Sequence, residues 1–137
     1  EPRTMQKNPV YTDLLSEVKS FLAERARALT DLGVSAEKIV LDPGFGFGKT
    51  VSQNFELLAK TEDFLSLGYP LLYGMSRKSS LGAVTGITKA EERLISSVTA
   101  HLLAVERGAS IVRVHDVKQM KEALTIYKAM VHYKDLK

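Results

Sequence analysis

The stretch 38–50, KIVLDPGFGFGKT, places a short apolar run ahead of glycines that alternate with phenylalanines and a Lys-Thr pair. A continuous apolar run of this length is typical of a parallel strand covered on both faces. Two later runs, YPLLYGM and ASIVRV, have the same character. The sequence therefore predicts strands near 38–42, 70–74 and 110–114.

Apolar residues recur at helical spacing around these runs. This pattern predicts helices over 13–32, 53–66 and 89–106, and a last helix from Asp116 to Val131. The expected boundary signals are Thr12 or Asp13 as the first cap, Gly33 after the first helix, a Thr88–Glu91 capping box, and Asp116 with Gln119. Buried strands that alternate with helices predict a parallel α/β architecture, either a barrel or a doubly wound sheet, with no internal domain boundary.

Composition narrows the class of protein. The 137 residues are 45% hydrophobic, which predicts one globular core. The 19 basic residues are scattered among 16 acidic ones, so the net charge of +3 favours a small anionic ligand and not nucleic acid. No apolar run is long enough to span a membrane, and the absence of cysteine fits a cytoplasmic location.

The glycine loop resembles a nucleotide-binding motif but departs from both common forms. A P-loop would need a glycine where Pro43 stands, and the dinucleotide fingerprint would need its third glycine at Lys49. The loop is also explained by a sharp turn off the strand with a solvated lysine. If the protein did bind ATP or NAD, the Lys49→Ala substitution would abolish that affinity.

Polar residues follow each predicted strand at its carboxyl end: Asp42, then Ser-Arg-Lys-Ser at 76–79, then Arg113 and His115. In a β/α barrel the carboxyl ends of all strands open on one mouth, so these groups would converge on one pocket. Taken singly, each has a simpler explanation as a cap, a surface charge or an ion-pair partner.

The remaining histidines point to no metal site. His101 lies beside the apolar stripe of a helix and is interpreted as structural, and His132 lies in a polar tail. The sequence has no HExxH motif and no acidic cluster, so we assign no metal ligand in this chain.

Three motifs, LDPGFGFGK, GMSRKSSLG and RVHDV, together resemble the carboxyl-terminal signatures of the dihydropteroate synthase family. QNFELL and the opening EPRTMQ extend the resemblance over nearly the whole chain. The family fold is a (β/α)8 TIM barrel. The resemblance implies that residues 1–137 are the carboxyl-terminal part of one pterin-binding barrel domain, carrying its last three strands and their helices.

The family joins 6-hydroxymethyl-7,8-dihydropterin pyrophosphate to p-aminobenzoate and releases pyrophosphate, a step of folate biosynthesis in which sulfonamides occupy the p-aminobenzoate subsite. The resemblance further implies Mg²⁺ held by residues outside this chain. It also implies a homodimer formed through the carboxyl-terminal helices.

The resemblance assigns roles to matching residues. Asp42, Gly74, Lys78 and Phe47 would bind the pterin, and Lys78 and Phe47 would also flank the p-aminobenzoate ring. Ser79, at the start of a short helix, would hold the p-aminobenzoate carboxylate.

The third motif supplies the groups that handle the leaving group. Arg113 and His115 would bind pyrophosphate, and Lys78 and Arg113 would be the catalytic residues. Arg77 would support the start of the short helix.

Three strands cannot close an eight-stranded barrel, so we expect the chain alone to be inactive and prone to association. Two other functions stay open. One is a non-catalytic pterin-binding or oligomerising fragment, and the other is a pterin-dependent methyltransferase domain.

Overall fold

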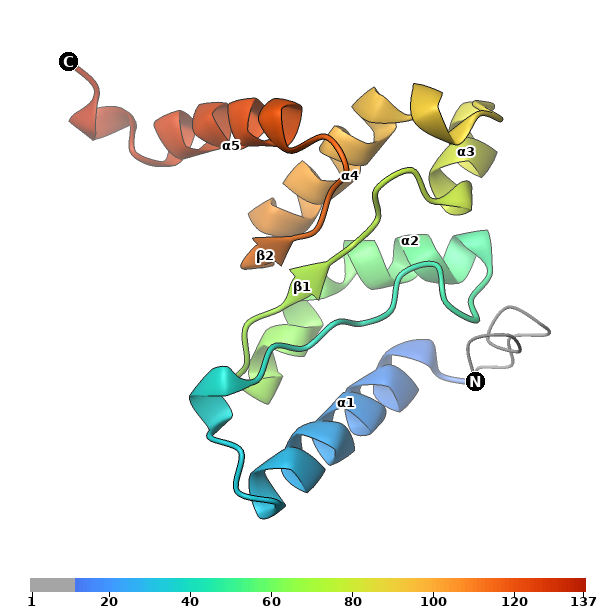
Figure 1. The fold of residues 1–137 in the computed structure, drawn as a ribbon, viewed down its shortest axis with the longest axis vertical. Coiled ribbons are helices and arrows are strands. Elements are labelled where there is room, and N and C mark those ends of the chain that lie inside the picture. The colour runs from blue at the N-terminus through green and yellow to red at the C-terminus, as the bar shows by residue number, and fades with distance from the viewer. Residues whose placement is uncertain (1–11) are drawn as a thin grey trace.

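The computed structural model describes residues 12–137 as an α/β arrangement that combines helices with short parallel strands (Figure 1). The opening motif EPRTMQ lies outside these residues. The elements in chain order are α1 (Leu14–Asp31), α2 (Val51–Ala59), β1 (Leu72–Tyr73), α3 (Ser79–Thr85), α4 (Leu94–Glu106), β2 (Ile111–Val112) and α5 (Val117–Val131). Short 3-10 helices span Ala36–Lys38, Thr61–Leu67, Ala90–Glu92 and Tyr133–Asp135.

The predicted parallel pairing is confirmed, although the regular strands are shorter than predicted. β1 pairs in parallel with β2, with Tyr73 opposite Val112. The first predicted strand is reduced to a parallel bridge between Leu41 and Leu71. Two backbone hydrogen bonds hold this bridge, from Leu41 N to Pro70 O at 2.9 Å and from Leu72 N to Leu41 O at 2.8 Å.

Only one face of this small sheet is covered, so the prediction of strands buried on both faces is wrong for residues 12–137. Side chains alternate between faces along a strand. Leu41 and Leu71 point to the helices and are 4% and 0% exposed. Val40 and Ile111 point the other way and are 42% and 39% exposed. The continuous apolar runs thus supply a core face and an open apolar face.

The covered face supports two hydrophobic clusters. Leu14, Val18, Leu22 and Ala26 recur every four residues along α1, and this stripe packs on Ile39, Leu41, Leu57, Phe64 and Leu71. A second cluster under the carboxyl half of the sheet joins Phe45, Leu58, Tyr73, Met75, Leu81, Ala100, Ala104 and Ala109. Each fully buried large side chain stabilises the fold by about 1.5–3 kcal/mol.

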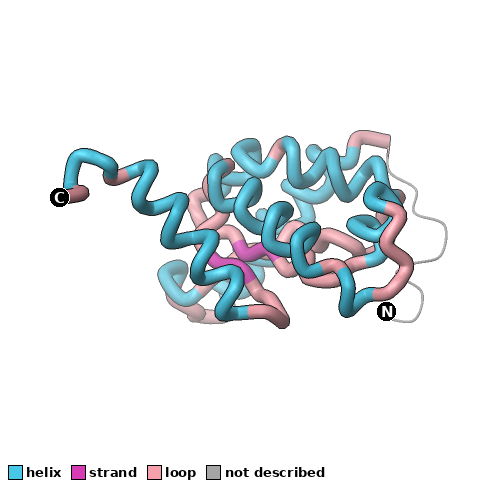
Figure 2. The backbone as a smooth tube through the Cα atoms, turned by 90° about the horizontal axis from the view of Figure 1, so that it is seen from above, coloured by secondary structure: helices cyan, strands magenta, loops and turns pink. Residues whose placement is uncertain are grey.

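The last helix has a different place in the fold. α5 buries only Met120, and Figure 2 shows it extending away from the other helices toward the carboxyl terminus. Its exposed apolar side chains include Ile126 and Met130, at 69% and 63%.

Some predicted helix boundaries are confirmed and others are corrected. Asp13 caps α1 by accepting from Ser16 N at 3.3 Å, and Gly33 follows the helix in a left-handed conformation. α2 starts earlier than predicted, because Thr50 forms a capping box with Gln53, and it ends at Ala59.

The predicted Thr88–Glu91 capping box is wrong. A 3-10 turn occupies Ala90–Glu92, α4 begins at Leu94, and the Thr88 carbonyl instead accepts from Arg93 Nη2 at 2.7 Å. Asp116 does precede α5, but its carboxylate makes no capping bond and pairs with Arg77.

Candidate active site

The carboxyl ends of the three extended segments place polar groups on the open face of the sheet. Each of these groups lies two residues after a strand residue: Asp42 after Val40, Gly74 after Leu72, and Arg113 after Ile111. The two-residue period of a strand keeps each pair on one face. The convergence predicted from the sequence therefore has a structural basis in the register of the pairing.

Lys78 lies between the glycine loop, residues 44–49, and the acidic end of the first segment. Its Nζ is 3.7 Å from the centroid of the Phe47 ring, a cation–π contact. A Cβ on Gly46 would come 2.8 Å from Lys78 Cδ, so a side chain at position 46 would displace the lysine. Burial lowers the pKa of Lys78, the charge of Asp42 opposes that shift, and the charge of Arg113 adds to it.

Arg113 lies across the end of β1. A Cβ on Gly74 would come 2.9 Å from Arg113 Nη2, so the bare backbone of Gly74 gives the guanidinium its place. The charge of Asp42 raises the pKa of Lys78 and the charge of Arg113 lowers it, so both charges lie near enough to act on the ammonium. A carboxylate, an ammonium and a guanidinium from three segments of backbone are brought together.

Hydrogen bonds from Lys49 and from Asn54 of α2 hold the glycine loop. Lys49 Nζ donates to Gly44 O and to Phe47 O, each at 2.9 Å, and Gly46 N donates to Asn54 Oδ1 at 2.7 Å. Burial lowers the pKa of Lys49, and the charge of Asp42 opposes that shift. Lys49 thus holds the loop's own carbonyls, and α2 begins only at Val51, which is not the geometry of a phosphate-binding P-loop.

Asp42 contributes to the same loop. Its Oδ1 accepts from Gly44 N at 2.9 Å, a local turn that fixes the carboxylate where the chain leaves the sheet. The aspartate is exposed, so its oxygens remain accessible from the open face.

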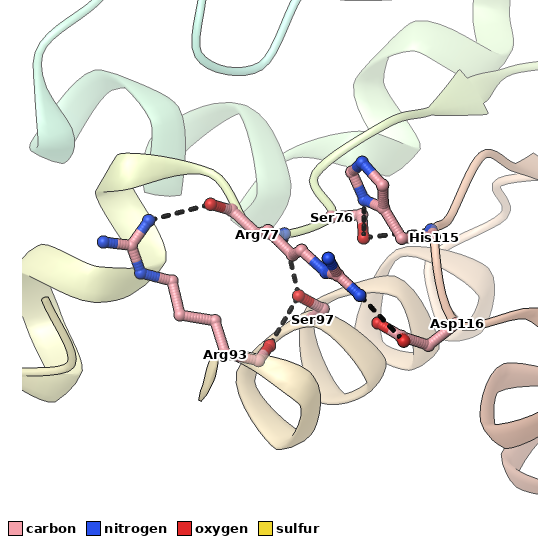
Figure 3. A network of polar contacts seen from close by, with 6 residues as sticks. All are labelled: Ser76, Arg77, Arg93, Ser97, His115 and Asp116. Carbon is pink, nitrogen blue, oxygen red and sulfur yellow. Dashed lines mark hydrogen bonds and ion pairs between the residues drawn. The ribbon is translucent and has the colours of Figure 1, made fainter. Parts of the chain in front are cut away.

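The turn 75–78 carries Lys78 and is held by side chains of α4 (Figure 3). Ser97 Oγ accepts from Arg77 N at 2.9 Å, and Arg93 Nη1 donates to Arg77 O at 2.8 Å. His101 Nε2 accepts from Met75 N at 3.0 Å. Arg93 and Ser97 were not among the site residues predicted from the sequence.

His101 has the structural place predicted for it. It is fully buried, and its Nδ1–H donates to Ser97 O at 2.7 Å because Nε2 is already the acceptor. Burial lowers the pKa of His101, which keeps the ring neutral.

His115 and Arg77 tie the ends of β1 and β2 together. His115 Nδ1 is 2.8 Å from Ser76 Oγ, and its backbone N–H donates to the same oxygen at 3.2 Å. Arg77 Nη2 lies 3.0 Å from Asp116 Oδ1 in an ion pair. Arg77 thus anchors the turn to the start of α5. The same turn leads into α3, which begins at Ser79.

No group of three or more His, Cys, Asp or Glu side chains among residues 12–137 could hold a metal ion. The groups gathered around Asp42 are cationic, which is a poor setting for Mg²⁺. The family resemblance places the ligands of Mg²⁺ outside this chain, and the residues described at this site do not fit a bound Mg²⁺.

Fold and site together define a parallel α/β protein with charged side chains gathered at the carboxyl ends of its strands. Residues 1–115 match the model of the pterin binding enzyme family, and the chain belongs to this family, with dihydropteroate synthases as its relatives.

Three relatives document the likeness. The dihydropteroate synthase of Escherichia coli K12 is 42% identical over 136 residues, which are 99% of this chain and 48% of that protein. The crystal structure of the Stenotrophomonas maltophilia enzyme, with imidazole bound in its active site, is 49% identical with a TM-score of 0.94, over 96% of this chain and 50% of that one. The Xanthomonas albilineans enzyme in complex with 7,8-dihydropteroate is 44% identical with a TM-score of 0.90, over 93% and 48%.

The chain spans about half the length of these relatives. Within residues 12–137, none of the helices has the length and apolar character needed to cross a membrane.

Proposed function

We propose that this chain is the carboxyl-terminal part of a dihydropteroate synthase barrel, carrying the last three strands of a (β/α)8 domain. In that role it supplies part of a site that joins 6-hydroxymethyl-7,8-dihydropterin pyrophosphate to p-aminobenzoate. The observation that carries the proposal is the meeting of Asp42, Lys78 and Arg113 at adjacent strand ends.

The pterin is assigned to Asp42, Gly74, Lys78 and Phe47. A carboxylate at a strand end can accept two hydrogen bonds from the amino and ring N–H groups of a pterin. The Lys78 ammonium would donate to the pterin's ring oxygen or nitrogen. Gly74 has no side chain to obstruct the pterin, and the Phe47 ring would bound the site beneath the Lys78 ammonium.

The p-aminobenzoate is assigned to Ser79, Lys78 and Phe47. Ser79 is the first residue of α3, so its backbone N–H belongs to the free donors of a helix start, and its hydroxyl is a second donor. Both would bind the p-aminobenzoate carboxylate. The aromatic ring of the substrate would then lie beside the Phe47–Lys78 pair.

The reaction needs charge stabilisation more than a nucleophilic side chain. The C–O bond to pyrophosphate breaks and its electron pair leaves with the pyrophosphate, so negative charge grows where Arg113 and His115 would lie. The p-aminobenzoate amine attacks the resonance-stabilised methylene cation, forms the C–N bond and loses its proton to water. Fixed cations at Lys78 and Arg113 favour this separation of charge.

The open face of the sheet supports the idea that the chain needs a further part to work. Val40 and Ile111 line it and are 42% and 39% exposed, where a closed barrel would bury them. We expect the chain alone to form no dihydropteroate. A steady-state assay that detects dihydropteroate from this polypeptide alone would contradict this expectation. For the complete enzyme we infer a homodimer through the carboxyl-terminal helices.

Binding measurements on the complete enzyme that carries these residues test the site. Asp42→Asn and Lys78→Ala are each expected to weaken 7,8-dihydropteroate binding at least about tenfold, or ~1.4 kcal/mol. Lys60→Ala at the far end of α2 is the matched control, because this exposed lysine lies at the opposite end of its helix from the glycine loop. Calorimetry that finds equal affinity in all four proteins would refute the assignment.

Pyrophosphate distinguishes the proposal from a pterin-dependent methyltransferase or a plain pterin binder. Arg113→Ala is expected to abolish competition by pyrophosphate against the pterin pyrophosphate substrate, while affinity for the free pterin is nearly kept. A protein in which pyrophosphate never competes has no synthase site.

A further inference from the structure

We propose that Arg93, Ser97 and His101 are positioning residues that fix the turn 75–78 and thereby direct Lys78 and the start of α3 into the site. The three residues touch neither proposed substrate. The inference rests on the proposed function, because Lys78 matters only if that site is used.

The spacing of the three residues makes one polar stripe. Arg93 is the cap of α4, and Ser97 and His101 follow at intervals of four residues, which places all three on one face of the helix. They are 9%, 3% and 0% exposed. Buried polar side chains destabilise a fold unless hydrogen bonds satisfy them, so their partners show what they hold.

Several of those partners are backbone groups of the turn. The paired strand ends at Tyr73, and Met75 and Arg77 would otherwise be left with unpaired N–H groups. Met75 N donates to His101 Nε2 at 3.0 Å, and Arg77 N donates to Ser97 Oγ at 2.9 Å. Side chains of α4 thus bond the backbone where the strand pairing has ended, and Figure 3 shows the bonds of Arg93 and Ser97 to Arg77.

Arg77 has an unfavourable left-handed backbone conformation that other residues must stabilise. Its φ is 60°, and no other non-glycine residue between 12 and 137 has a positive φ. This conformation costs about 1 kcal/mol or more for a residue with a side chain. Ser97 holds its N–H and Arg93 holds its carbonyl at 2.8 Å, so the bonds to α4 fix the strained residue directly before Lys78.

Arg93 extends the same control to α3. Its Nε and Nη2 donate to Ile87 O at 2.9 Å and Thr88 O at 2.7 Å, in the loop that follows α3. A Cβ on Gly82 would lie 2.5 Å from Arg93 Nε, so the guanidinium rests directly on the α3 backbone. One side chain therefore fixes both the turn that precedes α3 and the loop that follows it.

Ser97 is the most informative residue to substitute, because its hydroxyl both accepts and donates a hydrogen bond. It accepts from Arg77 N and donates to Arg93 O at 2.6 Å. Ser97→Ala removes both bonds with little change in volume. Ser96→Ala is the matched control, since Ser96 lies on the same helix and none of the turn's hydrogen bonds involves it.

The test measures the turn, Lys78 and the ligand separately by NMR and calorimetry on the complete enzyme. In Ser97→Ala, the Arg77 amide is expected to exchange with solvent about tenfold faster or more. The Lys78 side-chain signals, shifted by the Phe47 ring beneath the ammonium, are expected to move toward ordinary values. Dihydropteroate affinity is expected to fall about tenfold. Ser96→Ala is expected to change none of these, and Ser97→Thr, which keeps the hydroxyl, is expected to restore the Lys78 signals.

Arg93→Lys is the second variant in case Ser97→Ala does not fold, because it keeps the charge but cannot reach three carbonyls. It is expected to displace the same Lys78 signals. Unmoved Lys78 signals in the folded variants overturn the positioning role, even if stability falls. If the unsubstituted enzyme binds no dihydropteroate, the proposed function fails, while the amide and Lys78 measurements still decide whether the stripe positions the turn.

Discussion

The two walls of the site are built differently. The turn 75–78 is held by side chains of a separate helix, α4, which bond its backbone at Met75 and Arg77. The glycine loop is held mainly from within, by Lys49 on its own carbonyls and by Asn54 on Gly46 N. The two walls meet where Lys78 lies over Phe47. From this difference we expect the cationic wall to be rigid and the aromatic wall to be more compliant.

Removing the largest support of the rigid wall should have the largest effect. Arg93→Ala leaves the carbonyls of Arg77, Ile87 and Thr88 without their donor. Because bonds from a charged donor are worth about 1.5–3 kcal/mol each, with some recovery from water, we expect the free energy of unfolding to fall by about 3–4 kcal/mol. Urea denaturation measures this loss.

Lys89→Ala is the control for that substitution. Lys89 pairs with Glu92 at 3.4 Å on the surface, and its side chain is 67% exposed. Such a pair contributes about 0–1 kcal/mol. Equal losses for Arg93→Ala and Lys89→Ala would show that the turn does not depend on α4.

The compliant wall is also supported from α2 by Asn54, which is 1% exposed. Its Oδ1 accepts from Gly46 N, and its Nδ2 donates to Ser80 Oγ at 2.9 Å. Asn54→Ala should cost about 2 kcal/mol, because two buried groups lose a partner. Hydrogen exchange should quicken at Gly46 and remain unchanged at Arg77. Faster exchange at both amides would mean that the two walls form one unit.

The rigid wall should also depend on pH through His101. Burial holds the folded-state pKa of His101 below 6.5, the ordinary value of a histidine, so the unfolded chain binds the proton more readily. The stability that the neutral ring supplies is present above pH 6.5 and is lost as the pH falls through the lowered folded-state pKa. The slope in this window is at most about 1.4 kcal/mol per pH unit. Urea midpoints between pH 7 and 5 should fall less steeply in His101→Gln, and parallel curves would contradict this role.

The smallest effect is expected where the walls meet. Phe47 is 40% exposed, so Phe47→Leu should change the free energy of unfolding by about 0.5 kcal/mol or less. It should nevertheless remove the ring-induced shift of the Lys78 signals and weaken p-aminobenzoate binding a few-fold, since an exposed cation–π contact is worth about 0.5–1 kcal/mol. A large loss of stability would show that the aromatic wall is part of the core.

Much of the fold was predictable from local patterns. The stripe of α1, the parallel pairing and the polar strand ends follow from apolar periodicity and from the order of elements. The length of the strands was overestimated because a continuous apolar run indicates burial and not regular strand pairing. Burial on one face could not be told from burial on two, because the exposed residues Val40 and Ile111 are apolar as well.

The supports of the turn were not predictable in the same way. The Thr88–Glu91 pattern fits a capping box, yet the Thr88 carbonyl bonds with Arg93 and the helix begins later. Arg93, Ser97 and His101 did leave a signal, a polar residue at every fourth position of a helix that is otherwise apolar on that side. That signal indicates a buried hydrogen-bonding stripe, but only the structure names its partners.

The open apolar face of the sheet has a practical consequence for handling the polypeptide. Salts such as ammonium sulfate strengthen the burial of apolar surface, and a face lined by Val40 and Ile111 offers such surface to any neighbour. Precipitation of the isolated polypeptide at lower ammonium sulfate than a full-length relative requires would therefore be the simplest bench sign that this face is built to be covered.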